Sequence, residues 1–331
     1  MAEVSPLPDD VLELGKTLIP RPVFLIGCAR SGTSILGEAL AAHPSVAYLF
    51  EASRIWNELV PPRPDHRLVA ADATREVALE IYRALAEAHE EVRAAAGDAT
   101  RGAHPEGIPP RGVRREAVTG QGAAAGGAAG KARIADDTLL EKNPKHVIRI
   151  PFLDALFPHA RFVHIIRDGR DTTASLMFRN RGDRWGHLEI PGWRDLLAAY
   201  PKANHIRCAH QWRDSVRLAR ADAAGLGPGR YLEVRYEDLL RDPSRIAGGL
   251  LEFLGLAPHP SVDAFLPKIQ DATAGSYHAR RQVRHYVENH SRRMGRYREN
   301  LTPVECRDVE AVCGDLLREL GYGEPAVETP E

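Results

Sequence analysis

The chain has 331 residues, of which 44% are apolar and 27% charged, as in globular proteins with a full hydrophobic core. Its 44 lysines and arginines nearly balance 45 aspartates and glutamates, and the net charge of -1 disfavours a nucleic-acid-binding protein. No run of about 18 apolar residues is present, so we expect no membrane span. The acidic start has no signal-peptide pattern, and four scattered cysteines form no metal-binding spacing, so we expect a reduced cytoplasmic protein without a metal.

Short apolar runs alternate with helical patterns along the chain. The apolar runs predict strands at 22–27, 45–50, 161–166 and 230–235, and order returns after a polar stretch at 133–140. The helical patterns predict helices at 73–95, 146–156 and 192–222. Such alternation is typical of a parallel sheet with helices on both faces.

We therefore expect a single α/β domain over residues 21–322, with a P-loop-like central parallel sheet covered by helices on both faces. Residues 1–20 form an N-terminal extension and residues 323–331 a C-terminal tail in this interpretation. Residues 97–131 are rich in glycine and alanine and nearly lack large apolar side chains, which predicts a mobile insertion, either a lid or a disordered loop.

The sequence GCARSGTS joins the first predicted strand to a helical pattern. Gly27 and Gly32 have the spacing of a phosphate-binding loop, in which backbone N–H groups surround an anion at a helix N-terminus. Thr33 stands where ATP-using P-loops carry the lysine that reaches the β- and γ-phosphates, and Arg30 lies inside the loop. The pattern therefore favours a phosphate or sulfate without Mg²⁺ over a turn that merely joins strand and helix.

A second basic motif, RDGRDTTAS, begins where the predicted strand 161–166 ends. Ligands of open α/β sheets bind at the carboxyl ends of the strands. Arg167 and Arg170, together with Ser175, fit a clamp for a second phosphate, and an exposed salt-bridge cluster is the alternative.

The two motifs together resemble those of sulfotransferases that use 3′-phosphoadenylyl sulfate (PAPS), near the carbohydrate and protein-tyrosine branch. In that family the first motif holds the 5′-phosphosulfate and the second the 3′-phosphate. Three further segments resemble family motifs in the same order: EKNPKH at 141–146, VRYEDL at 234–239 and GRY at 295–297. The resemblance implies that an acceptor hydroxyl attacks sulfur in line and that adenosine 3′,5′-bisphosphate (PAP) leaves.

The resemblance also implies roles for individual residues. The 5′-phosphosulfate end of PAPS is held, by this resemblance, by Arg30 and by the backbone N–H groups of Ser31, Gly32, Thr33 and Ser34. Arg167 and Ser175 hold the 3′-phosphate, Tyr236 meets adenine, and Arg292, Arg293 or Arg296 of the basic stretch 280–298 lies near the 3′-phosphate.

Three residues are the candidates for the chemistry itself, beside Arg30. Lys142 is expected at the leaving oxygen or the sulfuryl group. Glu51 is the first candidate for the general base, because EASR resembles the EETR of protein-tyrosine sulfotransferases. His146 is its rival, since histidine's ordinary pKa of about 6.5 suits a base.

The sequence leaves the acceptor open among small-molecule, carbohydrate, lipid and peptide hydroxyls. Trp56, Trp185, Trp193 and Trp212 fit either a core or a pocket for an aromatic group or a sugar. The alternatives to a sulfotransferase are a P-loop kinase or another ATP-dependent phosphotransferase, and a non-catalytic nucleotide-binding protein.

Overall fold

A five-stranded parallel sheet forms the centre of the computed structural model, which describes residues 6–99, 137–180, 188–270 and 294–323. The strands are β1 (Pro22–Ile26), β2 (Val46–Phe50), β3 (Thr138–Lys142), β4 (Arg161–Ile166) and β5 (Tyr231–Arg235), in the spatial order β2-β3-β1-β4-β5. Four predicted strands are thus confirmed to within one residue. The predicted mobile insertion lies outside the described residues, except for its first three residues.

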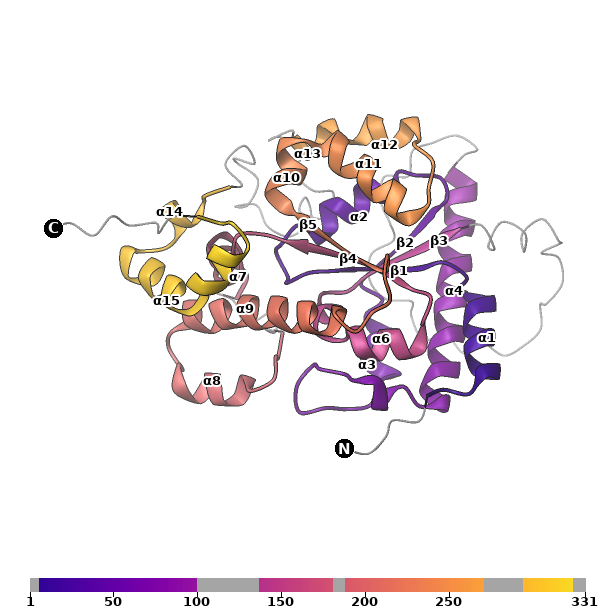
Figure 1. The fold of residues 1–331 in the computed structure, drawn as a ribbon, viewed down its shortest axis with the longest axis horizontal. Helices are drawn as coiled ribbons and strands as arrows, with labels where there is room; N and C mark the ends of the chain where they lie inside the picture. Colours follow the sequence, from indigo (N-terminus) through magenta and orange to yellow (C-terminus); the bar gives the residue numbers. More distant parts are fainter. Residues whose placement is uncertain (1–5, 100–136, 181–187, 271–293, 324–331) are drawn as a thin grey trace.

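Alternate side chains of the central strand β1 enter different layers of the core. Val23 and Leu25 pack in one cluster and Phe24 and Ile26 in the other, and every residue of β1 is buried. A strand covered on both faces needs a continuous apolar run, which explains the sequence PVFLI. The predicted α/β fold, with helices on both faces of a parallel sheet, is confirmed (Figure 1).

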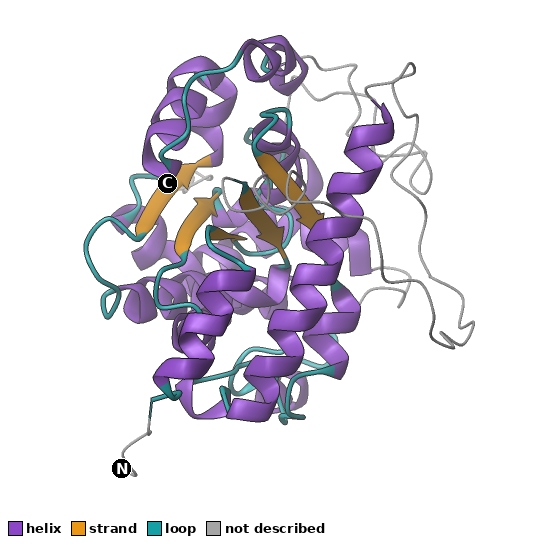
Figure 2. Ribbon diagram, turned by 90° about the vertical axis from the view of Figure 1, so that its right-hand side faces the viewer, coloured by secondary structure: helices purple, strands orange, loops and turns teal. Residues whose placement is uncertain are grey.

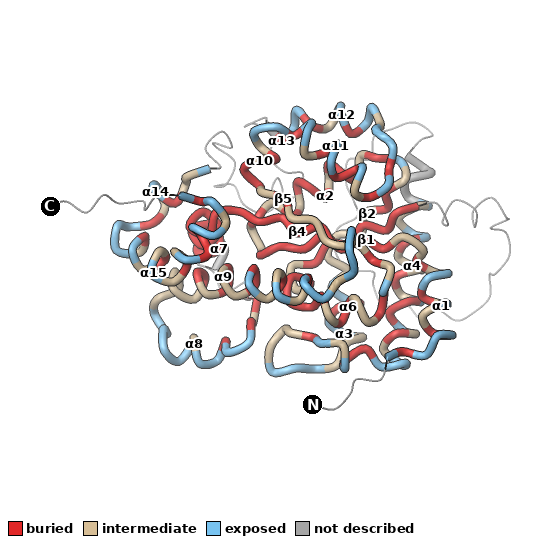
Figure 3. The backbone as a smooth tube through the Cα atoms, in the orientation of Figure 1, coloured by how far each residue is buried: buried red, intermediate tan, exposed pale blue. Residues whose placement is uncertain are grey.

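One helical layer covers the upper face of the sheet in Figure 1. It contains α2 (Thr33–Ala41), α10 (Tyr236–Arg241), α11 (Pro243–Leu254), α12 (Pro260–Phe265) and α13 (Pro267–Gln270). The opposite layer contains α1 (Asp9–Leu18), α3 (Ser53–Glu58), α4 (Arg75–Ala99), α6 (Ile150–Leu156), α8 (Trp193–Ala199) and α9 (Asn204–Ala223), with short 3-10 helices η1 (Ala70–Asp72) and η2 (Pro144–Ile148). Figure 2 shows the strands between these layers, and Figure 3 shows β4 buried along most of its length and the edge strand β5 only partly buried.

A third cluster lies beyond the carboxyl end of β4, at the left of Figure 1. It joins α7 (Gly169–Asn180), α14 (Tyr297–Asn300) and α15 (Pro303–Glu319) to the start of α9. All four cysteines are buried in this cluster as free thiols. The C-terminal helices thus pack directly on the helix that follows the second basic motif.

Helix α1 lies within the segment that the sequence predicted as an N-terminal extension. Its residue Gly15 faces Tyr82 of α4 so closely that a Cβ there would lie 2.5 Å from the ring. The two helices therefore approach each other because position 15 has no side chain, and Val11 of α1 is buried in the core.

Two predicted helices are each divided in two. The continuous helix expected at 192–222 is wrong: α8 ends at Ala199, and Tyr200 leaves the helical conformation directly before Pro201. Proline disfavours the α region in the residue before it, so α9 starts afresh at Asn204. The helix expected at 146–156 is likewise divided, into η2 and α6.

Candidate active site

The five parallel strands bring the sequence motifs to one edge of the sheet. Gly27 follows β1, Glu51 follows β2, Lys142 ends β3, Arg167 follows β4 and Tyr236 follows β5. The connections after β1 and β4, which are neighbours, lead in opposite directions across the sheet. Such a switch point is where open α/β sheets bind ligands.

The loop after β1 turns sharply before α2 begins at Thr33. The N–H of Ser31 donates to the carbonyl of Cys28 at 3.0 Å, and Arg30 and Gly32 have φ angles of 76° and 100°. A Cβ at position 32 would lie 2.4 Å from the ring of Tyr236, so only glycine fits there. The first-turn N–H groups of α2, including those of Thr33 and Ser34, thus begin at the sheet edge, where a helix favours an anion.

The two predicted anion-binding motifs are in direct contact. Nε of Arg30 donates to Oγ of Ser175 at 3.1 Å, and Nη1 of Arg167 donates to the carbonyl oxygen of Arg30 at 3.2 Å. The Arg167 guanidinium also lies 4.8 Å from the centre of the Tyr236 ring. Two cationic side chains and a hydroxyl, from segments 137 residues apart, therefore gather beside the N-terminus of α2.

Arg170 is not part of this cluster, so its predicted place in a two-arginine phosphate clamp is wrong. It is 5% exposed and is directed away, donating to both carboxylate oxygens of Asp168 at 3.1 and 2.8 Å and to the carbonyl of Tyr322 at 3.0 Å. An i to i+3 spacing places Arg167 and Arg170 nearly one helical turn apart, but the start of α7 aims only Arg167 toward the loop. Arg170 instead fixes the C-terminal helices to α7.

Asp171 connects the same helix to the GRY motif. Its two carboxylate oxygens accept hydrogen bonds from the backbone N–H groups of Gly295 and Tyr297 at 2.8 and 2.9 Å. Arg296 lies between these two residues and is partly buried. Of the three arginines predicted near the 3′-phosphate, Arg292 and Arg293 lie outside the described residues.

Glu51 and Lys142 form an ion pair beside the loop, with 2.5 Å between Oε1 and Nζ. The Lys142 side chain is 1% exposed and its Nζ lies 3.7 Å from the centre of the Phe50 ring, whereas the Glu51 side chain is 34% exposed. Burial lowers the pKa of Lys142, and the Glu51 carboxylate opposes that change. Glu51 also has a φ angle of 47° and donates its N–H to the carbonyl of Lys142 at 2.8 Å.

A family model described as the sulfotransferase family matches residues 22–260, which include the loop, the second basic motif, Glu51 and Lys142. The chain belongs to the sulfotransferase family. This confirms the resemblance inferred from the motifs and their order.

Similar sulfotransferases include proteins named for three kinds of acceptor. The omega-hydroxy-beta-dihydromenaquinone-9 sulfotransferase of Mycobacterium bovis is 28% identical over 162 residues, 46% of this chain and 39% of the relative. Carbohydrate sulfotransferase 5 of Mus musculus is 28% identical over 192 residues, 53% of this chain and 46% of the relative. Protein-tyrosine sulfotransferase 2 of Gallus gallus is 24% identical over 119 residues, 36% of this chain and 28% of the relative. The chain thus spans less than half the length of each relative.

His146 lies in the hydrophobic core, beneath the sheet edge. It is 0% exposed, and its Nε2 lies 2.7 Å from Oε2 of Glu141. Burial lowers the pKa of the ring. Its centre lies 4.5 Å from that of Trp56, in an edge-to-face arrangement. Of the two candidates for the base, only Glu51 therefore reaches the surface.

Other residues around the pair carried no sequence signal. Glu38 of α2 lies close enough for its charge to act on Lys142 and Tyr48. Burial raises the pKa of Glu38 to about 7, opposed by the charges of Lys142 and Lys268. The sequence does not predict the burial of Glu38, because that burial depends on how α2 packs over β2.

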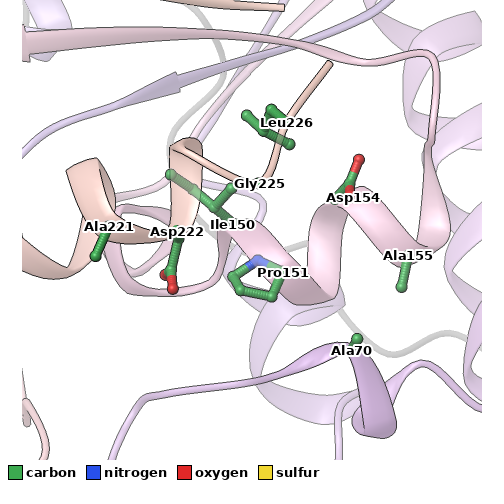
Figure 4. Close-up of a pocket in the computed structure, with 9 residues that line it drawn as sticks. All are labelled: Ala70, Ile150, Pro151, Asp154, Ala155, Ala221, Asp222, Gly225 and Leu226. Atoms are coloured by element: carbon green, nitrogen blue, oxygen red, sulfur yellow. The ribbon is translucent and has the colours of Figure 1, made fainter. Parts of the chain in front are cut away.

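One hollow of the described surface lies away from these residues. Figure 4 shows it between α6, the end of α9 and η1, lined by residues such as Ile150, Asp222 and Leu226. Asp154, which lines the hollow, pairs with Arg230 directly before β5, and this places the hollow toward the amino ends of the strands.

Within the described ranges, no helix is long and apolar enough to cross a membrane, and no three His, Cys, Asp or Glu residues are placed to hold a metal.

Proposed function

We propose that this chain transfers a sulfuryl group from PAPS to an acceptor hydroxyl and releases PAP. The observation that carries the proposal is the contact of Arg30 with Ser175 and Arg167, which unites two anion-binding motifs at one helix N-terminus. PAPS carries its two anionic groups on opposite sides of one ribose, so one ligand can engage both motifs. Family membership supports the same activity.

The roles proposed for the nucleotide site follow this geometry. Arg30 and the N–H groups of the loop and of α2 hold the 5′-phosphosulfate, where charge develops as PAP leaves. Arg167 and Ser175 hold the 3′-phosphate by charge-assisted hydrogen bonds, with Arg296 as a further candidate. Tyr236 is 4% exposed between Gly32 and Arg167, so we propose that it shapes the phosphate site in addition to any contact with adenine.

We propose Glu51 as the general base and Lys142 as the cation that stabilises the transferring group. The acceptor oxygen forms a bond to sulfur as the bond between sulfur and the 5′-phosphate oxygen breaks, and the hydroxyl proton passes to Glu51. Lys142 offsets the negative charge on the leaving oxygen. His146 has no exposed atom through which to meet an acceptor, which is why we prefer Glu51.

We propose the acceptor only by its chemical class, a hydroxyl group of a small molecule, a carbohydrate, a lipid or a peptide. The names of the relatives include a menaquinone, a carbohydrate and a protein-tyrosine sulfotransferase, which keeps each class open. The kinase alternative is disfavoured because Thr33 replaces the lysine that ATP-using loops need.

Calorimetry with PAP in the absence of metal tests the proposal, with ATP and Mg²⁺ as the comparison ligand. We expect PAP to bind and Arg167→Ala to weaken it by about 10- to 100-fold, because hydrogen bonds to charged groups contribute about 1.5–3 kcal/mol. Arg245→Ala is the matched control, since Arg245 is an exposed arginine of α11 paired with Asp242. Preference for Mg-ATP would support the kinase alternative, and PAP binding without PAPS turnover over a broad acceptor panel would support a non-catalytic protein.

A further inference from the structure

A charged residue in the centre of the sheet has no part in the proposed mechanism. Glu141 of β3 is 1% exposed, and its carboxylate lies against the side chains of Trp56 and His146. Oε1 accepts a hydrogen bond from the indole N–H of Trp56 at 2.8 Å, and Oε2 lies 2.7 Å from Nε2 of His146. A buried carboxylate of this kind is weak evidence for stability, because apolar residues of the same volume often serve a core as well.

The position of this cluster suggests another use. Glu141 directly precedes Lys142 in β3, and Trp56 lies in α3, the helix that follows Glu51. The backbone N–H of Glu51 donates to the carbonyl of Lys142, and the indole of Trp56 donates to Glu141. Two hydrogen bonds therefore connect the segment from Glu51 to Trp56, which carries the proposed base, to strand β3, which carries the proposed cation.

The turn at Glu51 needs such a connection. Its φ of 47° lies in the left-handed region, which a residue with a side chain adopts only where its surroundings hold it. Trp56 is itself fixed from several sides: Arg149 donates to its carbonyl at 3.2 Å, and the rings of His146 and Phe24 lie edge-on to it with centroids 4.5 and 6.3 Å away. A rigid Trp56 thus fixes where α3 begins and so the direction of the Glu51 side chain.

We propose that Trp56, Glu141 and His146 form a buried support that sets the position of Glu51 relative to Lys142. Trp56 and Glu141 are then positioning residues for sulfuryl transfer, whereas nucleotide binding depends on other elements. This inference rests on the proposed function, because it concerns how the proposed base and cation are held.

The test separates chemistry from nucleotide binding. The rate of PAPS cleavage to PAP and sulfate, with water as the acceptor, is measured together with PAP affinity by calorimetry. Trp56→Phe removes the indole donor, and we expect about 10- to 100-fold slower cleavage with PAP affinity within about twofold, because small misplacements of catalytic groups have effects of this size. Glu141→Gln keeps an acceptor for Trp56 and an amide N–H for His146, and should retain most of the rate.

Tyr82→Phe is the matched control. Tyr82 is equally buried in the same core cluster and donates to the carbonyl of Leu156 at 2.6 Å, away from the sheet edge. This variant should cleave PAPS at the wild-type rate. If Trp56→Phe does not fold, Glu141→Met, which has a similar volume and no acceptors, serves in its place.

Three results would overturn the inference alone: wild-type cleavage by Trp56→Phe, equal losses of rate and PAP affinity in that variant, or an equal loss of rate in Tyr82→Phe. A wild-type protein that neither binds PAP nor cleaves PAPS would instead overturn the proposed function, and this inference with it.

Discussion

Glu51 and Lys142 form one ion pair, yet the structure predicts that replacing one or the other has very different effects on stability. The Lys142 side chain is 1% exposed, whereas that of Glu51 is 34% exposed. In Glu51→Ala, a buried ammonium loses the only carboxylate that the structure places within ion-pair distance of it among the described residues. In Lys142→Met, the remaining carboxylate can be hydrated from solvent, and the buried position receives an apolar chain of similar length.

The size of the difference follows from burial. Removing one partner of a fully buried pair costs about 3–5 kcal/mol. Because Glu51 is about one-third exposed, solvent screening reduces this, and we expect Glu51→Ala to lose about 2–3 kcal/mol. Lys142→Met should change stability by less than about 1 kcal/mol, since replacing a buried charge by an apolar group is often neutral. The double variant should recover most of the loss of Glu51→Ala.

Urea unfolding of the four proteins measures these differences, and its pH dependence adds a second check. Burial already lowers the pKa of Lys142, and removal of Glu51 lowers it further. Between this folded value and the unfolded value of about 10.4, the unfolded state binds more protons, so stability rises with pH. The deficit of Glu51→Ala should therefore shrink as the pH approaches 10. Equal destabilisation by Lys142→Met and Glu51→Ala, at every pH, would refute the reasoning.

Two further substitutions test how the nucleotide site is held. Gly32→Ala should lose about 1–3 kcal/mol of stability and weaken PAP binding, because φ is 100° at this position and the new methyl group would meet the Tyr236 ring. Urea unfolding measures the stability and calorimetry the PAP affinity. An unchanged unfolding midpoint would contradict this prediction. Asp171→Asn leaves one acceptor oxygen for the N–H groups of Gly295 and Tyr297, at a cost of about 1–3 kcal/mol. Hydrogen exchange at these two amides should accelerate, and wild-type protection would contradict the assignment.

The local pattern of the sequence was enough to predict most of the sheet. Four strands were placed to within one residue because short runs rich in apolar residues mark them; β1 and β4 are buried along almost their whole length, and β2 and β5 only in part. The strand β3 was harder to place, since it contains Glu141 and Lys142, and charged residues interrupt the apolar pattern. The helix predicted at 192–222 is interrupted at Pro201, because a proline disfavours the helical conformation in the residue before it, here Tyr200.

The motifs also predicted which residues gather at the sheet edge, because the carboxyl ends of parallel strands share that edge. Spacing could not predict the direction in which each side chain points. Arg167 and Arg170 look equivalent in sequence, but only Arg167 faces the loop, while Arg170 binds Asp168 and the C-terminal segment.

The sequence by itself determined the family, the parallel sheet and the glycine-containing loop for which we propose anion binding, since these depend on residue types at short spacing. Only the tertiary structure shows how the surroundings of the two candidates for the base differ. Glu51 and His146 are both titratable residues beside a strand, yet one is partly exposed and the other fully buried against Trp56. The burial of a side chain depends on how segments distant in the sequence pack together. A titratable side chain can exchange a proton with a substrate only where this packing leaves it accessible.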